Sequence, residues 1–600
     1  MQLSDFDTCD NLVALFLARA DALSEEPMLW CKRDGSWKPL SWGDAARQVC
    51  LIAEALRSKG LAPGDRVMLV SENRPEWCLA DLGIMAAGCV TVPAYITNTE
   101  RDHTHILENS GARAAVVSSA KLAETLVPAV TQTDVCEFLF SMEPIRHAQE
   151  GSFSYHGWGE LLAGDGAAAR AAVERRIANI ARQDLACIIY TSGTGGAPRG
   201  VRHHHGAILH NVGACARIIS EDFGWSKEVF LSFLPLSHAY EHTGGQFLPI
   251  GLGAQIYYAE GLEKLASNMS EVRPTVMVVV PRLFELLRGR IIKQVEKQGA
   301  MPKRLMSWAM AVGNRKAKGK PRILDGPLDF IVARTLKPKI RETFGGRIKA
   351  LVSGGAPLNP EVGTFFDAMG LTLLQGYGQT EAAPVISCNR PRDGLKMDTV
   401  GVPLHGVEVR IAEDGEILAR GELVTHGYWS NDAETARTIK DGWLHTGDIG
   451  HQDEKGRIVI TDRKKDMIVN DKGDNVSPQK VQSMLTLQTE IAQAMVTGDK
   501  RPYIVGLIVP DEEWAAEWAE LHAVPADLDS LRENPEFYAA VREAIDRVNA
   551  QLSTTEKIRK FAFANQAFTI ENEEMTPSLK IRRHKLRERY GDRLDELYHR

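Results

Sequence analysis

The sequence contains no C-x-x-C pair, and its nine cysteines are scattered along 600 residues. This pattern indicates mostly buried thiols in a reduced, cytoplasmic compartment. The first ten residues, MQLSDFDTCD, lack the basic region and the apolar run of a secretory signal. The longest uncharged runs, residues 82–99 and 242–259, are interrupted by glycine and proline. We therefore expect buried strands and loops there, and no membrane span.

The chain also lacks an excess of basic charge. It has 71 Lys and Arg residues against 78 Asp and Glu, which gives a net charge of −7 and a pI near 6.2. That balance argues against a dedicated nucleic-acid-binding protein. Hydrophobic residues at 44% and charged residues at 25% are ordinary for a globular protein and exclude a disordered, collagen-like or coiled-coil chain.

The order of strand-like and helical patterns predicts an α/β protein with more than one domain. A single core rarely exceeds about 250–300 residues, so 600 residues require at least two. Apolar, β-branched runs alternate with helical patterns over the first 450 residues, which favours parallel sheets covered on both faces. Short strands and tight turns follow from about residue 405. We place the domain boundary at the charged residues 462–466, with domains 1–462 and 463–600.

A loop rich in glycine and hydroxyl groups reads TSGTGGAPRG over residues 191–200, after an apolar strand pattern and before a helical one. Such a loop lets backbone N–H groups approach phosphate oxygens, and Arg199 can add positive charge. The Walker pattern G-x-x-x-x-G-K-[ST] is not matched, so a standard P-loop is not indicated. The alternative interpretation is a flexible turn.

Two further loops follow predicted strands. QGYGQTE, at residues 375–381, combines glycines that permit close backbone approach with Tyr377, whose ring could stack on a base. Thr380 and Glu381 supply oxygen ligands suited to Mg²⁺. SGGAP occupies residues 353–357. Ligands commonly bind at the carboxyl ends of parallel strands. Each loop alone could equally be an ordinary strand-to-helix turn.

Two charged positions near the end of the chain have plain alternatives. Asp448 closes GWLHTGD and could cap a turn, or could accept both hydroxyls of a ribose. Lys580 ends TPSLK, and residues 580–589 contain six Lys or Arg and one Glu. Such a run is usually a solvated surface.

Together these motifs resemble the acyl-adenylate-forming superfamily, which includes acyl-CoA synthetases, adenylation domains and firefly luciferase. The resemblance covers about residues 42–585 and rests on YTSGTGGAPRG, SGGAPL, QGYGQTE, GWLHTGD, DRKKDMI and TPSLK in the family's order. LSFLPLSHAYEHT and VPRLFE resemble the long-chain fatty acyl-CoA synthetase branch.

The resemblance implies a fold and a reaction. The fold is α/β: a large N-terminal domain with two αβ-layered sheets and a small β-barrel, then a small mobile α+β C-terminal domain. The reaction is the ATP- and Mg²⁺-dependent conversion of a fatty acid to acyl-AMP and pyrophosphate, followed by transfer to coenzyme A. The implied enzyme class is an acid–thiol ligase.

The resemblance also implies roles for individual residues. Catalytic roles fall to Lys580, Thr194, Glu381 and His238, with Thr194 and Glu381 around Mg²⁺. Lys465 occupies the hinge position and Gly473 approaches coenzyme A. The residues implied to bind nucleotide or coenzyme are Thr191, Ser192, Gly193, Gly195, Gly196, Arg199, Gly355, Ala356, Pro357, Gly376, Tyr377, Gly378, Thr380, Asp448, Arg463, Lys465 and Gly473.

Three positions depart from the family pattern. Gly195 stands where Thr is usual, Arg199 where Lys is usual, and Gln479 where Glu is common. Arg199 keeps the charge but presents a planar fork, so we expect a changed ATP affinity. A histidine that follows an apolar strand is more often a core residue, and His238 is expected to shape the acyl pocket without acid–base chemistry. The histidines at residues 203–205 are expected to begin a helix without binding a metal.

Two other functions stay open. The acyl group could pass to a carrier protein acting in trans, or the chain could bind nucleotide without catalysis. The sequence leaves open the acyl chain length, the oligomeric state, a homodimer included, and peripheral contact of the basic tail with the inner face of a membrane.

Overall fold

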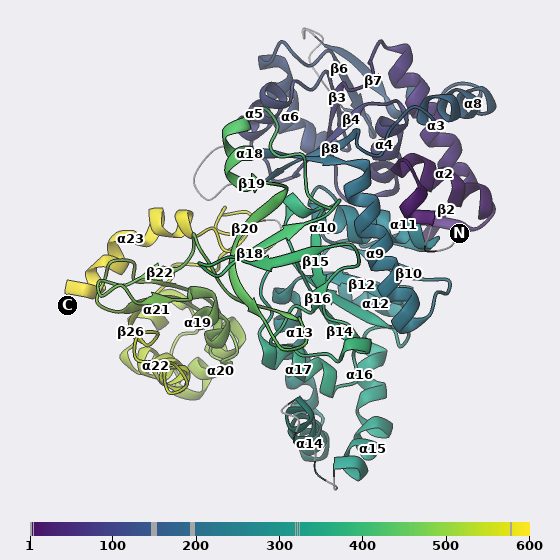
Figure 1. Ribbon diagram of the computed structural model, residues 1–600. Helices are drawn as coiled ribbons and strands as arrows, with labels where there is room; N and C mark the ends of the chain where they lie inside the picture. Colours follow the sequence, from purple (N-terminus) through teal and green to yellow (C-terminus); the bar gives the residue numbers. More distant parts are fainter. Residues whose placement is uncertain are drawn as a thin grey trace.

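The computed structural model describes residues 3, 5–145, 153–191, 198–317, 320, 322, 325–576 and 579–599. Figure 1 shows a large domain, coloured purple to green, beside a small yellow-green domain at the C-terminal end of the chain. This arrangement confirms the predicted α/β architecture with a smaller C-terminal domain.

A nine-stranded sheet forms the centre of the large domain. Its parallel middle is flanked by antiparallel strands at both edges. In spatial order its strands are β16 (Val402–Pro403), β15 (Val385–Cys388), β14 (Leu373–Gly378), β13 (Ala350–Ser353), β12 (Val276–Val279), β10 (Val229–Ser232), β11 (Gln255–Tyr258), β1 (Pro27–Arg33) and β2 (Ser36–Ser41). The middle strands are buried on both faces, as their apolar sequences predict.

A seven-stranded sheet lies above it in Figure 1. Its strands, in spatial order, are β7 (Ser154–Gly157), β6 (Phe138–Ser141), β5 (Ala114–Val117), β3 (Arg66–Val70), β4 (Val90–Ala94), β8 (Leu185–Thr191) and β9 (Arg199–His204). Every neighbouring pair is parallel except β8 and β9.

Helices cover both sheets. They are α1 (Asp5–Thr8), α2 (Leu12–Ala22), α3 (Trp42–Ser58), α4 (Pro75–Ala86), α5 (Glu100–Ser110), α6 (Ala120–Gln132), α7 (Trp158–Leu161), α8 (Gly166–Ile177), α9 (His205–Phe223), α10 (Ala239–Glu241), α11 (Leu248–Leu252), α12 (Leu265–Val272), α13 (Pro281–Lys297), α14 (Ala300–Ala317), α15 (Asp325–Thr335), α16 (Lys337–Thr343) and α17 (Pro360–Ala368). A π-helical turn spans His242–Phe247, and 3₁₀ turns span Thr380–Ala382 and Pro391–Asp393. One apolar core reaches from Phe6 to Ala383 and joins the helices of the two sheets.

A third sheet stands where the small barrel is expected. It has five antiparallel strands: β17 (Glu408–Ile411), β18 (Glu416–Arg420), β19 (Ile439–Lys440), β20 (Trp443–Gln452) and β21 (Ile458–Arg463). A hairpin turn at Asp414-Gly415 joins β17 to β18. Helix α18 (Asp432–Thr438) precedes β19.

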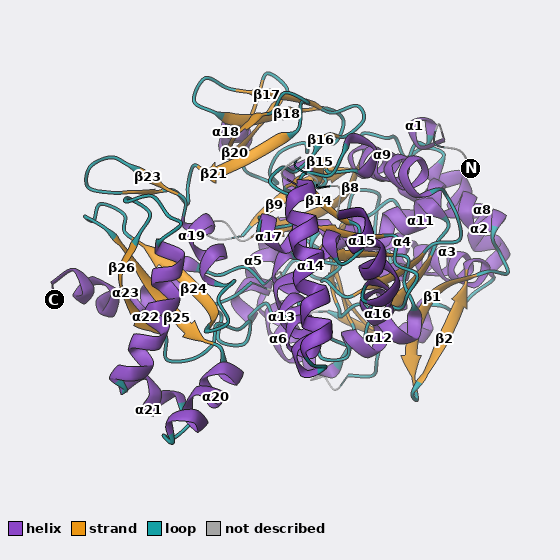
Figure 2. Ribbon diagram, turned by 90° about the horizontal axis from the view of Figure 1, so that it is seen from below, coloured by secondary structure: helices purple, strands orange, loops and turns teal. Residues whose placement is uncertain are grey.

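The C-terminal domain has its own core, which is built around a three-stranded sheet. Its elements are β22 (Ile468–Val469), β23 (Asn475–Val476), β24 (Ile491–Thr497), β25 (Ile504–Pro510), β26 (Ile558–Phe563), α19 (Pro478–Leu485), α20 (Glu512–His522), α21 (Leu528–Glu533), α22 (Pro535–Asn549) and α23 (Arg583–His599). Figure 2 shows this domain beside the large one, facing α13 and α17.

A few polar contacts hold the C-terminal domain against the large one. Arg282 Nη2, on α13, donates to the carbonyl of Ala492 at 2.6 Å. Asn359, which caps α17, donates from Nδ2 to the carbonyl of Ser483 at 3.2 Å. Lys293 forms an ion pair with Glu513. The domains are therefore held in one defined arrangement. In the described part of the chain, no helix has both the length and the apolar character needed to cross a bilayer.

Candidate active site

The centre of the site is a hydrogen-bonded group on two neighbouring sheets. Tyr377 Oη donates to Asp448 Oδ2 at 2.7 Å, and Arg463 Nε donates to Asp448 Oδ1 at 2.8 Å. Asp448 is 5% exposed and Tyr377 is 8% exposed. Burial and the neighbouring carboxylate raise the pKa of Tyr377 well above its usual value, so the phenol keeps its proton. Asp448 therefore fixes both a tyrosine and an arginine.

Asp448 does not close a turn, so the cap interpretation is wrong. It lies within β20, directly opposite Arg463 of β21. Alternate residues of β20 are buried, which places Leu444, Thr446 and Asp448 on the inner face of the strand. Strand alternation, not a helix cap, directs this carboxylate toward Tyr377.

The QGYGQTE motif also differs from expectation, because its first four residues are the end of β14 and do not follow it. The sheet continues to Gly378 because β15 pairs with this segment. A Cβ at Gly378 would lie 1.8 Å from the carbonyl oxygen of Pro384, so only glycine fits there. Close backbone approach is thus a requirement of strand pairing at this position.

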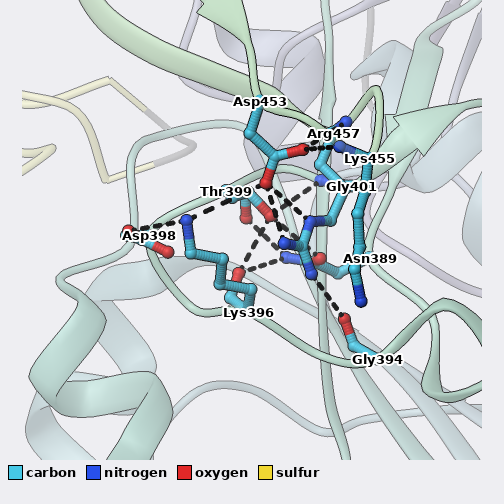
Figure 3. Close-up of polar contacts among 9 residues, drawn as sticks. All are labelled: Asn389, Gly394, Lys396, Asp398, Thr399, Gly401, Asp453, Lys455 and Arg457. Atoms are coloured by element: carbon cyan, nitrogen blue, oxygen red, sulfur yellow. Dashed lines mark hydrogen bonds and ion pairs between the residues drawn. The ribbon is translucent and has the colours of Figure 1, made fainter. Parts of the chain in front are cut away.

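Figure 3 shows polar contacts within the loop between β15 and β16, and between that loop and the turn that joins β20 to β21. The backbone N–H of Asn389 donates to the carbonyl of Gln375 at 2.8 Å. The side chain of Asn389 donates to the carbonyl of Thr399, and Arg457 Nη1 donates to the carbonyl of Gly394 at 3.2 Å. The loop between β15 and β16 is therefore fastened both to the β20–β21 hairpin and to the strand that carries Tyr377.

Tyr428 joins two of the predicted loops, and the sequence interpretation missed it. Its hydroxyl donates to Glu381 Oε1 at 2.7 Å, and its ring faces the guanidinium of Arg199 at 5.2 Å. Arg199 also forms an ion pair with Glu434 of α18. Tyr428 and Glu434 lie far from the glycine-rich loop in sequence and belong to no motif. The only local signal for Tyr428 is an aromatic residue beside a glycine.

The glycine-rich loop itself lies partly outside the described residues, which include Thr191 and Arg199 but not Ser192, Gly193, Thr194, Gly195 or Gly196. Thr191 ends β8 and pairs with Arg199 of β9. The expected helix after the loop is preceded by this antiparallel strand. His203 and His204 belong to β9, but His204 also caps α9, because its Nδ1 accepts from the backbone N–H of Ala207. His205 is the first residue of the helix, so the predicted helix start is wrong only for His203.

The SGGAP loop follows β13 as expected. Gly355 has a φ of +81°, a left-handed conformation that favours glycine. Gly354 packs against the ring of Tyr240, since a Cβ there would lie 2.7 Å from Tyr240 Cζ. Tyr240 Oη donates to the carbonyl of Val352 at 3.0 Å. Ala356 and Pro357 complete the turn that leads toward α17.

His238 lies at the start of α10, where its Nδ1 accepts a hydrogen bond from the backbone N–H of Tyr240 at 3.1 Å. Burial lowers the pKa of His238 to about 3, and the positive charge of Lys580 contributes. The imidazole is therefore neutral at pH 7. A neutral histidine here can shape a pocket or donate a hydrogen bond from Nε2.

Lys580 reaches the site from the C-terminal domain. Its backbone N–H donates to Thr576 Oγ1 at 3.0 Å in a tight turn. Lys580 keeps an exposed surface, but the protein packed around its ammonium, with Arg463 adding repulsion, lowers its pKa to about 8. Asp448 and Asp466 oppose that shift. The charges of Asp448 and Arg463 therefore influence the pKa of Lys580.

An apolar cluster lies beside Lys580. The neighbouring residue, Leu579, packs with residues of the large domain in a group made by Phe233, Leu234, Tyr240, Val278 and Val280. These come from the ends of β10 and β12 and from α10. A charged centre therefore adjoins an apolar wall that both domains build.

Two predicted residues lie apart from this centre. Lys465 is exposed in the turn between β21 and β22. Gly473 lies in the turn of the β22–β23 hairpin with a φ of +85°, and a Cβ there would meet no atom within 4 Å. The structure thus unites Tyr377, Asp448, Arg463, His238 and Lys580 and leaves Gly473 at the surface of the small domain.

The donor set fits magnesium only in combination with a substrate. Within the described ranges, no group of three His, Cys, Asp or Glu side chains is arranged to hold a metal. Glu381 offers one carboxylate, which Tyr428 orients. Mg²⁺ commonly takes one or two protein carboxylates and completes its shell with phosphate oxygens and water, so Glu381 suits a metal that arrives with a triphosphate.

The fold and the site define a two-domain α/β protein whose charged centre is completed by a lysine of the small domain. The family model described as AMP-binding enzyme matches residues 16–429, and the model of the AMP-binding enzyme C-terminal domain matches residues 465–600. The chain belongs to the AMP-binding enzyme family.

Relatives and solved structures agree with this assignment. The chain is 33% identical to the long-chain-fatty-acid–CoA ligase FadD15 of Mycobacterium bovis, over 94% of this chain and 93% of that protein. It is 30% identical to the peroxisomal long chain acyl-CoA synthetase 6 of Arabidopsis thaliana, over 94% and 82%. The adenylation domain of a carboxylic acid reductase from Segniliparus rugosus, solved with AMP and a co-purified carboxylic acid, superimposes with a TM-score of 0.77 at 19% identity, covering 98% and 94%.

Proposed function

We propose that the chain is an ATP-dependent long-chain fatty acid–CoA ligase. It activates a fatty acid as acyl-AMP, releases pyrophosphate, and then forms acyl-CoA and AMP. The full-length similarity to two long-chain acyl-CoA ligases supports this substrate class. The observation that carries the mechanism is the position of Lys580, whose neighbour Leu579 packs against the apolar cluster of the large domain. There the charge of Lys580 helps to lower the pKa of His238, and Arg463 helps to lower the pKa of Lys580.

In the first step a carboxylate oxygen attacks the α-phosphorus of ATP. The bond from that phosphorus to the bridging oxygen breaks, and pyrophosphate leaves. Two anions must approach each other, so cations aimed at the developing charge lower the barrier. We assign Lys580 to the carboxylate and the α-phosphate, and Thr380 to the α-phosphate.

The nucleotide would lie over the Asp448 group. Asp448 and Arg463 would hold the ribose hydroxyls, and Tyr377 would face the base, with Gly376 and Gly378 permitting its approach. Gly355, Ala356 and Pro357 would line the adenine pocket. The phosphate-binding residues are assigned as Thr191, Ser192, Gly193, Thr194, Gly195, Gly196 and Arg199. Mg²⁺ bound with ATP, held by Glu381 and Thr194, would neutralise phosphate charge.

The acyl chain would begin at the apolar cluster of Leu234, Tyr240, Val278 and Val280. His238 accepts a hydrogen bond from the backbone of Tyr240, a residue of this cluster, and its low pKa keeps it uncharged. We therefore assign it to shaping the acyl site. Burial of an aliphatic chain in a dry apolar cluster favours binding by about 0.8 kcal/mol for each CH₂ group.

In the second step the sulfur of coenzyme A attacks the acyl carbon, the bond to the AMP oxygen breaks, and the thiol proton passes to solvent. Lys580 and Leu579 cover the centre in the present domain arrangement. We infer that the small domain turns at Lys465, withdraws Lys580 and brings Gly473 toward the coenzyme. The exposed position of Gly473 in this structure fits a residue that awaits that movement.

A substrate panel tests the proposal. Pyrophosphate release and acyl-CoA formation would be measured with acids from acetate to oleate, in the presence of ATP, Mg²⁺ and coenzyme A. We expect acyl-CoA from long chains such as palmitate. No product with any medium- or long-chain acid would reject the proposal, and a thioester formed only on an added carrier protein would favour the carrier-directed alternative. We further propose that the enzyme works in the cytoplasm, at the inner face of a membrane.

A further inference from the structure

The C-terminal run of cations is not available as a membrane-binding surface. Lys580 occupies the proposed active site. Lys585 pairs with Glu573 at 3.1 Å, and Arg589 pairs with Glu574 at 2.8 Å. Arg593 Nη1 donates to the carbonyl of Phe563 at 2.8 Å. These charges hold α23 against its own domain, so an interaction surface must be sought elsewhere.

A strong concentration of positive charge lies in residues 300–340, which include α14, α15 and most of α16. This segment contains ten Lys and Arg residues against two Asp, a net charge of +8 in a chain whose net charge is −7. Figure 1 shows α14 and α15 projecting from the lower end of the large domain. Such a local field attracts an anionic partner over a distance set by the ionic strength.

Only one side of this helical hairpin is needed for packing. On α14, Ala309 and Val312 are buried, and Gly313 lies close to Ala368 of α17, because a Cβ at Gly313 would be 2.7 Å from Ala368 Cβ. Val332 of α15 is fully buried in the same core. The outer side of the hairpin is left free of protein in the described part of the chain.

Two large apolar side chains of α15 are exposed. Phe330 is 56% exposed and Ile331 is 44% exposed, on consecutive positions of α15. The guanidinium of Arg334 lies over the ring of Phe330 at 4.3 Å. Exposed phenylalanine and isoleucine beside cations are typical of a helix that lies in the interface of a bilayer.

The two aspartates of the segment cannot neutralise its cations. Asp325 forms an ion pair with Arg315, and Asp329 is shared by Lys316 and Lys337, at 2.9 and 2.7 Å. Lys320, Arg322 and Arg334 are exposed, and Arg334 lies over the ring of Phe330. We define the hairpin tip surface as Lys320, Arg322, Phe330, Ile331 and Arg334.

A comparison with Leu521 shows that an exposed apolar side chain alone does not indicate a membrane-binding surface. Leu521 of α20 is 82% exposed, more than either Phe330 or Ile331. Its helix carries Glu512, Glu513, Glu517 and Glu520, so its surroundings would repel an anionic bilayer. The hairpin combines apolar exposure with positive charge, whereas α20 combines it with negative charge.

We propose that the hairpin tip surface docks the enzyme on an anionic lipid bilayer. Phe330 and Ile331 enter the interface, and the cations face lipid phosphates. The proposal rests on the proposed function insofar as long-chain fatty acids dissolve in bilayers. Helix α13 runs directly from the end of β12, whose Val278 lines the apolar cluster, to α14, so the hairpin and the proposed acyl site share one continuous segment.

Sedimentation with lipid vesicles tests the docking surface. The full chain, without ATP, fatty acid or coenzyme A, would be mixed with vesicles of phosphatidylcholine alone or with 30% phosphatidylglycerol added. We expect binding to the anionic vesicles that weakens as sodium chloride is raised, and at least tenfold weaker binding to the neutral ones. No binding to anionic vesicles, or equal binding to both, would overturn the proposal.

Two variants and one control locate the contact. Lys320→Glu/Arg322→Glu/Arg334→Glu should weaken binding by about 100-fold or more, and Phe330→Ser/Ile331→Ser by about tenfold. Leu521→Ser, which removes the most exposed leucine, should bind as the wild type does. Hairpin variants that bind like the wild type would refute the assignment.

Activity distinguishes this proposal from the function itself. Each variant would be assayed with palmitate dispersed in detergent, so that turnover does not require vesicle binding. The substituted residues lie outside the proposed active site, so we expect turnover like that of the wild type. Wild-type turnover together with lost vesicle binding supports docking by the hairpin and shows that the variant is folded. An enzyme that binds anionic vesicles but makes no acyl-CoA would retain the docking surface and lose the proposed function.

Discussion

The large domain and the small domain contribute to the site in opposite ways. In the large domain, Asp448 is buried and accepts hydrogen bonds from both Tyr377 and Arg463. In the small domain, Lys580 is exposed, and its backbone N–H donates to Thr576 Oγ1. One half of the site is fixed by its own contacts, whereas the other half depends on where a whole domain stands.

This difference explains how one site can serve two reactions. Fixed donors hold the nucleotide in both steps, since acyl-AMP is the product of the first and the substrate of the second. A lysine delivered by a domain can be present in one step and absent in the other. The predictions below test whether the two halves separate in this way.

Lys580→Ala should have the largest effect. Removing a cation aimed at the transition state costs about 10²–10³-fold in rate, so acyl-AMP formation should fall by that factor. Thioester formation from supplied acyl-AMP should stay close to wild type. Pyrophosphate release measures the first step and acyl-CoA from synthetic acyl-AMP the second. Equal loss in both would refute the division of labour.

Asp448→Asn should damage both steps, since it acts on the fixed half. Losing a charged acceptor of two buried hydrogen bonds costs about 1.5–3 kcal/mol, or roughly 10–100-fold in KM for ATP. Tyr377→Phe is the matched control because it removes one of those bonds and keeps the ring; we expect a change of only a few fold. Steady-state kinetics with ATP and with acyl-AMP measure both variants. A tyrosine variant as impaired as the aspartate variant would contradict the central role of Asp448.

Lys465→Pro should affect the step that needs domain movement. Proline fixes φ near −65° and stiffens the turn between β21 and β22. We expect about a tenfold loss in thioester formation and a smaller loss in adenylation. Lys465→Ala removes the charge without the stiffening and serves as control. If adenylation alone is depressed by the proline, the hinge lies elsewhere.

The pH dependence of the adenylation rate should reflect the titration of Lys580. The pKa of Lys580 is lowered to about 8, so its ammonium is present below that pH and is lost above it. We expect kcat/KM for ATP in the adenylation step to fall about tenfold for each pH unit above 8. Lys580→Arg keeps its charge throughout this range, so any activity that it retains should lack this decline. A wild-type profile flat to pH 9.5 would contradict the assignment.

The family and the principal motifs could be predicted from the sequence, but the secondary structure that positions those motifs could not. A turn cap was one of the two interpretations of Asp448, yet strand pairing with β21 fixes this residue. Local patterns do not show which strand will pair alongside. Strand β9 was missed for the same reason, because its partner β8 lies across the glycine-rich loop. Tyr428 and Glu434 could not be found at all, because their contacts with Glu381 and Arg199 exist only after the third sheet folds against the others.

Arg199→Lys should give the smallest effect and tests how far the fixed half depends on one side chain. The guanidinium of Arg199 is already engaged by Glu434 and by the ring of Tyr428. A lysine keeps the charge but loses the planar stacking, so it should rest less firmly against Tyr428 and reach further toward the phosphates. We expect KM for ATP to change by a few fold while acyl-AMP conversion by added coenzyme A is unaffected, because that step involves no triphosphate. Glu434→Gln, which frees Arg199 without changing its shape, should shift KM for ATP through the same contact. Wild-type KM in both variants would show that Arg199 lies outside the phosphate site and that the ion pair only fastens α18 to β9.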